Sequence, residues 1–296
     1  MSWAPRSEWS RGVWVVLFVS VCVIAPLALF VHDFMLESLK VPYPATVRLP
    51  NSVKFLGDLV RLSSLALMCR LSLPLLRHFP RGLAALLIGL LVIMLNETFR
   101  VFAIESTIIG NPFYAAFDIA PRALSWLTCG AAVAWLSISD GKSRNVAIAV
   151  IVLAALEVFA LRPALDAACA FLKNHLSAPT TLYTDPYPFK INALIYVTFV
   201  EPTIAAFAFV SFCWPALGNG TLRRIMAFAA LLLLIRGRVT QFFVETFWVN
   251  QPLGIAFLAE SQFLLETLVL GSLVALTWSY AMRIQSEVGR STEARP

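Results

Sequence analysis

Residues 102–117 read FAIESTIIGNPFYAAF, and residues 242–257 read FFVETFWVNQPLGIAF. A glutamate, an Asn/Gln-Pro pair and an Ala-Phe pair therefore recur 140 positions apart. A Pro-Tyr-Pro triplet also occurs twice, at 42–44 and at 186–188. Because both copies lie in long apolar stretches, the pattern predicts a duplicated membrane module of several helices. Chance resemblance between apolar helices is the alternative explanation.

Composition supports the membrane interpretation. Hydrophobic residues make up 59% of the 296-residue chain and charged residues 14%, a balance that excludes an ordinary soluble domain. A helix needs about 20 residues to cross about 30 Å of hydrocarbon. We therefore predict an all-α fold, a polytopic bundle of about eight transmembrane helices. The predicted spans are 13–31, 53–74, 83–104, 121–138, 145–162, 191–214, 224–245 and 254–281.

The number of spans sets the relation between the two halves. Four spans per half is an even number, so the second copy enters the membrane in the same orientation as the first. The sequence thus predicts two parallel four-helix repeats, 1–144 and 145–282, related by an axis along the membrane normal. The polar tail, 283–296, is predicted to be a disordered cytoplasmic segment.

The distribution of positive charge predicts the orientation. If the termini are inside, the inner segments carry 11 lysines and arginines, against 7 in the outer segments and outer span ends. This bias predicts cytoplasmic termini in a bacterial-type inner (plasma) membrane. It also accounts for the net charge of +6, so no nucleic-acid partner is predicted. The apolar run 13–31 is longer than the roughly 7–15 residues of a signal-peptide core, which favours an uncleaved first span.

Polar side chains inside the predicted spans form the candidate site. A charged side chain costs about 2.5–3.5 kcal/mol at the bilayer centre, so such residues must face the bundle interior, water or one another. The candidate ligand-binding residues are Asn96, Glu97, Arg100, Glu105, Arg236, Arg238, Gln241, Glu245, Glu260 and Glu266. The alternative is that they form only structural ion pairs between helices. The predicted pairs join Arg236 or Arg238 to Glu201, Glu260 or Glu266, and Arg61 or Arg100 to Asp58, Glu97 or Asp118.

Three residues carry a resemblance to a membrane-enzyme family. Cys69, followed by Asn96 and Arg100 on a later span, resembles part of the motif of exosortase-type membrane peptidases, over about thirty residues. The resemblance implies a cysteine nucleophile assisted by arginine. The chain departs from the motif, because Asn96 and Arg100 are one residue too far apart and no Ser-Gly pair follows Cys69. The CAAX-processing type of membrane protease needs paired glutamates, and Glu97 lacks a glutamate neighbour.

No metal site and no cofactor are predicted. The five cysteines and three histidines lack ligand spacing, and no phosphate-cradling glycine loop occurs. The leading hypothesis is transport or binding of a small or lipid-like molecule in a polar cavity between helices. The alternatives are a non-catalytic subunit or assembly factor of a membrane complex, and an intramembrane peptidase or transferase. The predicted partners are membrane lipids and, as a further option, another membrane protein.

The halves also differ in their polar residues. Asn96 corresponds to Arg236, and Arg100 corresponds to Thr240, at the same spacing of 140. Different polar linings in matched helices favour a single site away from the repeat axis over a symmetric pore.

Overall fold

The described part of the chain consists of helices joined by short connections, without a β-strand. The computed structural model describes residues 9–44, 49–139, 142–177, 180–183 and 187–293. In chain order the elements are α1 (Arg11–Asp33), η2 (Phe34–Ser38), α2 (Asn51–Leu71), α3 (Leu73–Leu76), α4 (Arg81–Leu95), α5 (Thr98–Ile109), α6 (Pro112–Ile138), α7 (Ser143–Leu156), η3 (Glu157–Leu161), α8 (Arg162–Lys173), α9 (Phe189–Thr198), α10 (Val200–Cys213), η4 (Trp214–Ala216), α11 (Thr221–Ile235), α12 (Arg238–Phe243), η5 (Glu245–Trp248) and α13 (Leu253–Glu293).

Several of these helices are long and apolar enough to cross a membrane, as expected of an integral membrane protein. Within the described residues there are five, namely Arg11–Ser38, Pro112–Ile138, Ser143–Lys173, Phe189–Ala216 and Leu253–Glu287. The pair α4 and α5, bent by 48°, makes a sixth if it counts as one span. The other two predicted spans correspond to α2 and to α11 with α12. Charged residues interrupt α2, and α11 ends after 15 residues.

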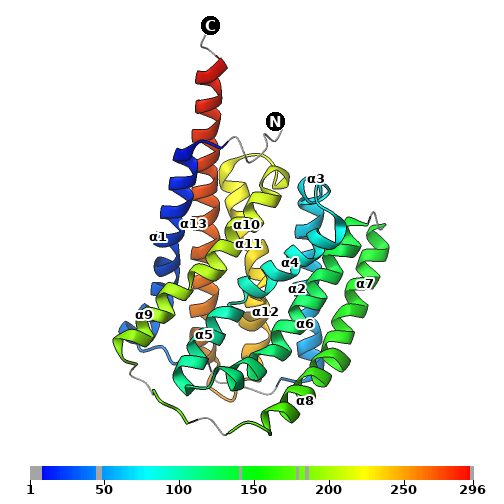
Figure 1. Cartoon of the computed structure of the whole chain (residues 1–296), viewed down its shortest axis with the longest axis vertical. Coiled ribbons are helices and arrows are strands. Elements are labelled where there is room, and N and C mark those ends of the chain that lie inside the picture. The colour runs from blue at the N-terminus through cyan, green and yellow to red at the C-terminus, as the bar shows by residue number, and fades with distance from the viewer. Residues whose placement is uncertain (1–8, 45–48, 140–141, 178–179, 184–186, 294–296) are drawn as a thin grey trace.

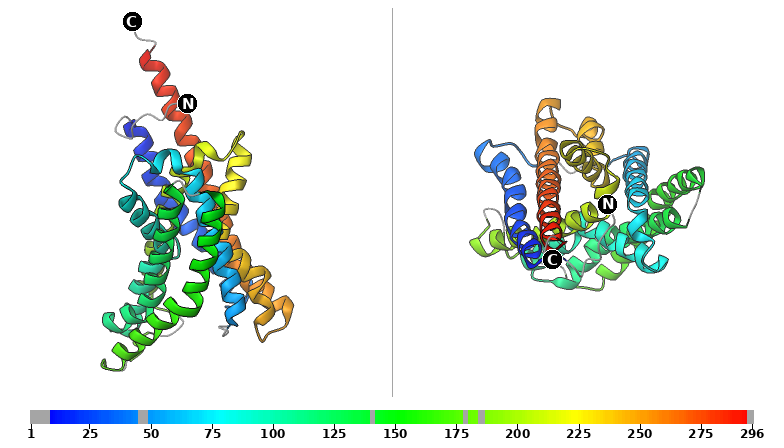
Figure 2. Two further views of the ribbon diagram at one scale, coloured as in Figure 1. Left: turned by 90° about the vertical axis from the view of Figure 1, so that its right-hand side faces the viewer. Right: turned by 90° about the horizontal axis from the view of Figure 1, so that it is seen from above.

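The first and last helices lie side by side along one flank of the bundle (Figure 1). The Ser10 N–H donates a hydrogen bond of 3.1 Å to Gln285 Oε1, so α1 starts beside the C-terminal part of α13. That part of α13 projects beyond the other helices (Figure 2). The helix continues through Glu293, past residue 283, where the disordered cytoplasmic tail was predicted to begin. Residues 294–296 lie outside the described residues.

Small residues let two helix pairs approach closely, α4 with α6 and α11 with α13. A Cβ atom added to Gly89 would lie 2.8 Å from the Leu127 carbonyl oxygen. One added to Gly271 would lie 3.0 Å from the Cα atom of Ala229. Close backbone contact over glycine and alanine is how helices pack inside a membrane, where dispersion and not hydrophobicity drives association.

Two helical rods are broken at matched positions. Between α4 and α5, Glu97 takes a left-handed conformation with φ 60°. Between α11 and α12, Gly237 does the same with φ 72°. The two break residues are 140 positions apart, as are the starts of α4 and α11. The predicted spans 83–104 and 224–245 were expected to be continuous, and both are interrupted here.

Two other predicted boundaries shift. The predicted span 121–138 begins earlier, at Pro112, because the Asn111 side chain accepts a hydrogen bond of 3.1 Å from the Tyr114 N–H and caps the helix. The predicted span 145–162 continues through a π-helical turn into α8 and ends at Lys173. Proline at 163 is tolerated because it stands in the first turn of α8.

Candidate functional site

The two helix breaks meet in one buried group of charges. Glu97 accepts hydrogen bonds from Arg100 on α5 and from Arg236, the last residue before the second break. Arg236 Nη1 also lies 3.3 Å from Glu266 Oε1 on α13. We call Glu97, Arg100, Arg236 and Glu266 the central ion cluster. Its four members come from both halves of the chain.

The helix breaks create the hydrogen-bonding groups that surround this cluster. When α5 starts anew at Thr98, its first N–H groups have no partner within the helix. Glu201 on α10 is the acceptor for two of them: its carboxylate accepts hydrogen bonds from the Phe99 N–H at 3.0 Å and from the Arg100 N–H at 2.5 Å. A carboxylate at a helix N-terminus is also favoured by the helix dipole.

A third break fixes the Arg100 side chain. The rod made of α9 and α10 is interrupted at Phe199. Arg100 Nε donates to the carbonyl oxygen of Ile195 at 3.3 Å, and its guanidinium carbon lies 5.2 Å from the centre of the Phe199 ring. Arg100 thus touches a carboxylate, a carbonyl and an aromatic face, and its conformation is set on several sides.

Charge balance explains why the central ion cluster tolerates burial. It contains two guanidinium groups and two carboxylates, and the Arg236 side chain is 0% exposed. Removing such charges from water costs several kcal/mol each, and only good geometry with opposite charges offsets that cost. Of the pairs predicted from sequence, Arg236–Glu266 and Arg100–Glu97 are confirmed. The Arg236–Glu97 pair, which joins the two halves, was not predicted.

A second group of polar residues lies just beyond the second break. Arg238 Nη1 donates to Gln241 Oε1 at 2.7 Å, and the guanidinium carbon lies 4.9 Å from the centre of the Phe263 ring. Within the described part of the chain, no carboxylate lies within 4.0 Å of Arg238. Glu260 on α13 is 8% exposed, and its Oε2 atom is buried without a hydrogen-bond partner.

The remaining predicted site residues lie elsewhere. Asn96 uses its side-chain N–H to bond its own helix, at Val92 O, 2.9 Å away. Glu245 faces α2, where its Oε1 atom lies 3.9 Å from the position a Cβ would take on Gly57. Glu105 lies near Asp118 on α6. The structure therefore brings together four of the predicted residues in the central ion cluster and does not bring these three into it.

Another buried ion group joins α2, α6 and the π-helical turn η3. Arg61 Nη2 lies 2.6 Å from Glu157 Oε1 and 2.9 Å from Asp58 Oδ1. The Ser125 hydroxyl donates to the same Glu157 oxygen at 2.8 Å. The Arg61–Asp58 pair was predicted from sequence and is confirmed. The Arg61–Glu157 contact, between residues 96 positions apart, was not among the predicted pairs.

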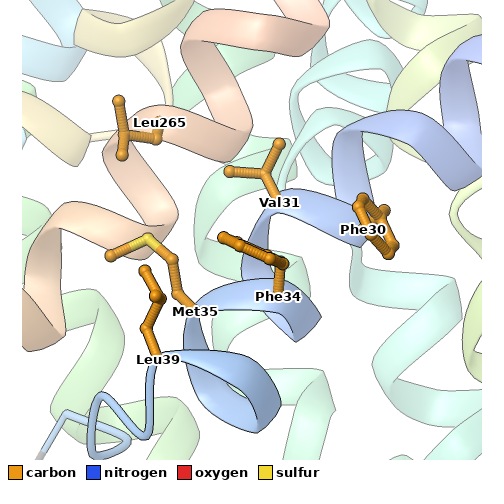
Figure 3. Close-up of a pocket in the computed structure, with 6 residues that line it drawn as sticks. All are labelled: Phe30, Val31, Phe34, Met35, Leu39 and Leu265. Carbon is orange, nitrogen blue, oxygen red and sulfur yellow. The ribbon is translucent and has the colours of Figure 1, made fainter.

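Aromatic side chains surround the approach to Arg238. The Phe263 ring lies 4.9 Å from the His32 ring and 5.6 Å from the Tyr43 ring, measured between centres. We call His32, Tyr43 and Phe263 the aromatic trio. On the same two helical segments, α1 with η2 and α13, six apolar side chains line a pocket (Figure 3), namely Phe30, Val31, Phe34, Met35, Leu39 and Leu265.

The structure offers little to the peptidase resemblance. Cys69 is 0% exposed and belongs to the apolar core, whereas a nucleophilic cysteine sits in a partially exposed, electropositive environment. Asn96 and Arg100 are engaged as described above. Among the described residues, no group of three or more histidine, cysteine, aspartate or glutamate side chains is arranged to hold a metal ion.

Comparisons with protein-family models, with curated proteins and with solved structures find no match to this chain.

Proposed function

We propose that this integral membrane protein binds and transports a small or lipid-like molecule where its two broken helices meet. The observation that carries the proposal is the contact of Arg236 at the second break with Glu97 at the first. Transporters commonly place their binding site near the membrane centre, at the interface of two repeats and beside discontinuous helices. Ionisable groups at such a depth are costly and mark substrate or ion pathways.

The proposal includes an internal duplication. We infer two four-helix repeats of the same orientation, covering 1–144 and 145–282, with α2 and α11 as membrane-crossing members. Three matches at a spacing of 140 support it, namely the starts of α4 and α11, the left-handed break residues, and the repeated glutamate segment. A rotation that exchanges the halves would bring the two breaks to a common centre.

We also propose the orientation and the surroundings. The contact between Ser10 and Gln285 supports placing both ends of the chain on one side of the membrane, and the positive-inside bias favours the cytoplasm of a bacterial-type inner membrane. Membrane lipids are then the partners of the exposed apolar side chains, such as Phe18 and Phe159. A second membrane protein remains the further option.

The asymmetry between the breaks favours a binding centre over a purely structural ion network. At the first break, Glu97 pairs with Arg100, and Glu201 accepts a hydrogen bond from the Phe99 N–H. At the second break and on the facing α13, buried polar atoms of Arg236, Arg238 and Glu260 have no hydrogen-bond partner among the described residues. Native proteins seldom leave such atoms unsatisfied unless a ligand, an ion or water takes them.

Proteoliposomes containing the full chain provide the test. Solute-induced charge movement is recorded on a supported membrane for panels of amino acids, organic acids, sugars and short-chain lipids. We expect at least one class to give a response that Arg236→Gln abolishes, while Arg162→Gln, which changes a half-buried arginine paired with the exposed Asp166, preserves it. Size-exclusion chromatography and circular dichroism confirm that each variant folds. An unchanged response in a folded protein carrying both Arg236→Gln and Arg238→Gln would contradict the proposal.

A further inference from the structure

The partly buried Arg238 and the buried Glu260 carry opposite charges but do not pair with each other within the described residues. Arg238, at the start of α12, keeps its Nε atom buried and without a partner. Glu260, on α13, does the same with its Oε2 atom. Arg238 lies over the Phe263 ring, and Glu260 is three positions before Phe263 on α13, so both side chains lie on the side of that helix that carries the ring. No salt bridge joins them within the described residues. Arg236 Nη1 and Glu266 Oε1, from the same two parts of the chain, lie 3.3 Å apart as an ion pair, although neither atom makes a hydrogen bond within the described residues.

This arrangement has a physical cost. A buried charge without a hydrogen-bonded counter-ion is expensive, and both side chains are long enough to reach other partners. Arg238 does not reach Glu260 because its guanidinium group bonds Gln241 and lies over the Phe263 ring. The guanidinium and the carboxylate therefore remain apart, each with hydrogen-bonding capacity to spare.

We propose that Arg238 and Glu260 bind the two ends of a zwitterionic head group, in which an ammonium group is joined to a phosphate or carboxylate. This assignment rests on the proposed function, since it names the ligand class of that site. The anionic end would take two N–H donors of the guanidinium, a geometry that suits phosphate and carboxylate. The ammonium end would donate to Glu260 and leave the site with no net change in charge.

The aromatic trio supplies the path to this site. Tyr43 is 62% exposed, and its ring meets the edges of His32 and Phe263. Phe263 in turn carries Arg238 on its ring. Aromatic faces attract ammonium groups, with a strength of about 0.5–2 kcal/mol in proteins generally. A zwitterion that enters beside Tyr43 thus meets favourable surfaces before it reaches the two charges.

The neighbouring apolar pocket favours a lipid as the source of the head group. Its lining residue Met35 follows His32 by three positions on the continuous helical segment made of α1 and η2, so the two side chains lie on one face (Figure 3). One molecule with a polar head at the aromatic trio and a hydrocarbon chain over Phe34 and Met35 would occupy both features. An aminophospholipid has this chemistry, and a free amino-alcohol phosphate has the head group alone.

The experiment measures binding to the full chain in detergent by native mass spectrometry. Three lipids with identical acyl chains are compared, namely phosphatidylethanolamine, phosphatidylglycerol, and phosphatidylethanolamine with its amine acetylated. Free phosphoethanolamine is titrated separately by calorimetry. We expect phosphatidylethanolamine to bind about tenfold more tightly than the other two lipids, since each lacks the ammonium group that bonds a charged carboxylate.

Matched variants locate the site. Glu260→Gln should remove the preference for the free amine, and Arg238→Gln should weaken phosphatidylethanolamine about tenfold. Arg238→Lys, which keeps the charge but not the paired donors, is the second variant if Arg238→Gln folds poorly. Glu37→Gln, at an exposed glutamate on η2, should change nothing. Tight binding of free phosphoethanolamine would support the head-group site and assign a soluble source.

Three results would overturn the inference: equal affinity for the three lipids, no binding of any of them or of free phosphoethanolamine, or a preference that survives Glu260→Gln and Arg238→Gln. These results are distinguishable from failure of the proposed function. If charge movement depends on Arg236 but not on Arg238 or Glu260, the proposed transport is supported and the zwitterion site is contradicted. If the protein prefers phosphatidylethanolamine but no solute induces charge movement, the head-group site is supported and the proposed transport is contradicted.

Discussion

The two helix breaks, at Glu97 in the first half and Gly237 in the second, share a left-handed turn but are stabilised in different ways. Glu97 pairs with Arg100, and Glu201 caps the helix that follows. The position 140 residues before Glu201 is Arg61, which pairs instead with Asp58 and Glu157. The second break therefore has no equivalent acidic cap, and the helix after it, α12, is half as long as α5.

This difference suggests that the two halves have different roles. The first break is closed by its own side chains and by α10, so it acts as a fixed partner. The second is held mainly by the contacts of Arg236 with Glu97 and Glu266, while Arg238 bonds Gln241 and has no salt bridge within the described residues. Under the proposed duplication, one copy keeps its hydrogen bonds and the other gives them to the proposed ligand, which would yield one asymmetric site.

The largest expected effect comes from Glu97, because it serves both breaks. Glu97→Ala leaves Arg100 without its salt bridge and Arg236 with Glu266 alone. Removing one member of a buried ion group generally costs about 3–5 kcal/mol, so we expect a comparable loss in the free energy of unfolding, measured by denaturant titration in mixed micelles. Glu37→Ala, at an exposed position, is the control and should stay within about 0.5 kcal/mol. Equal stability of the two variants would mean that the breaks are not joined through Glu97.

Next in size is the close approach of α4 to α6. A Cβ added at Gly89 would lie 2.8 Å from the Leu127 carbonyl oxygen, while one at Gly130, in the same pair of helices, meets nothing nearer than 3.4 Å. Overpacking typically costs about 1–3 kcal/mol, so Gly89→Ala should lower the thermal midpoint. Gly130→Ala should be neutral or slightly stabilising, since alanine favours helix. If both substitutions behaved alike, the contact between the two helices would be looser than described.

A smaller effect is expected at the second break itself. Gly237→Ala places a side chain on a residue with φ 72°, although the nearest atom, Thr240 Oγ1, is 3.8 Å away and leaves room. The penalty is then backbone strain alone, roughly 1–2 kcal/mol for a left-handed residue. Thermal unfolding would detect it, with Gly254→Ala as the control, where a Cβ meets nothing within 4 Å. A stabilised Gly237→Ala variant would show that this turn is not left-handed.

The smallest change concerns the cap of α5. Glu201→Gln keeps one acceptor oxygen for the Phe99 and Arg100 N–H groups but removes the charge at the helix N-terminus. Loss of such an interaction usually costs about 1 kcal/mol. Hydrogen exchange of the amides at the start of α5 should rise in this variant, while exchange at the start of α12 should not change. Faster exchange at both places would mean that the two breaks open together.

The sequence predicted the all-helical membrane fold because a balance of 59% hydrophobic and 14% charged residues leaves few other solutions. It also predicted the pairs Arg100–Glu97, Arg61–Asp58 and Arg236–Glu266, the first of them from helical spacing. It missed the interruptions at Glu97 and Gly237. The leucine-rich sequence before each of them predicts a continuous helix, and nothing in the neighbouring residues indicates that Glu97 takes a left-handed backbone conformation. It missed the Arg236–Glu97 contact as well, since pairing across 139 positions depends on how the two halves pack. The matched spacing of 140 was the one signal that pointed to it.

The most direct test of this account is the coupling free energy between Glu97 and Arg236. It is obtained by denaturant unfolding of the wild type, Glu97→Gln, Arg236→Gln and the double variant. If the two breaks form one ion cluster, the second substitution adds little once the first is made, and the coupling should be about 1–3 kcal/mol, the range for groups in one network. Additive effects, with a coupling near zero, would contradict the central claim that the two halves meet at their breaks.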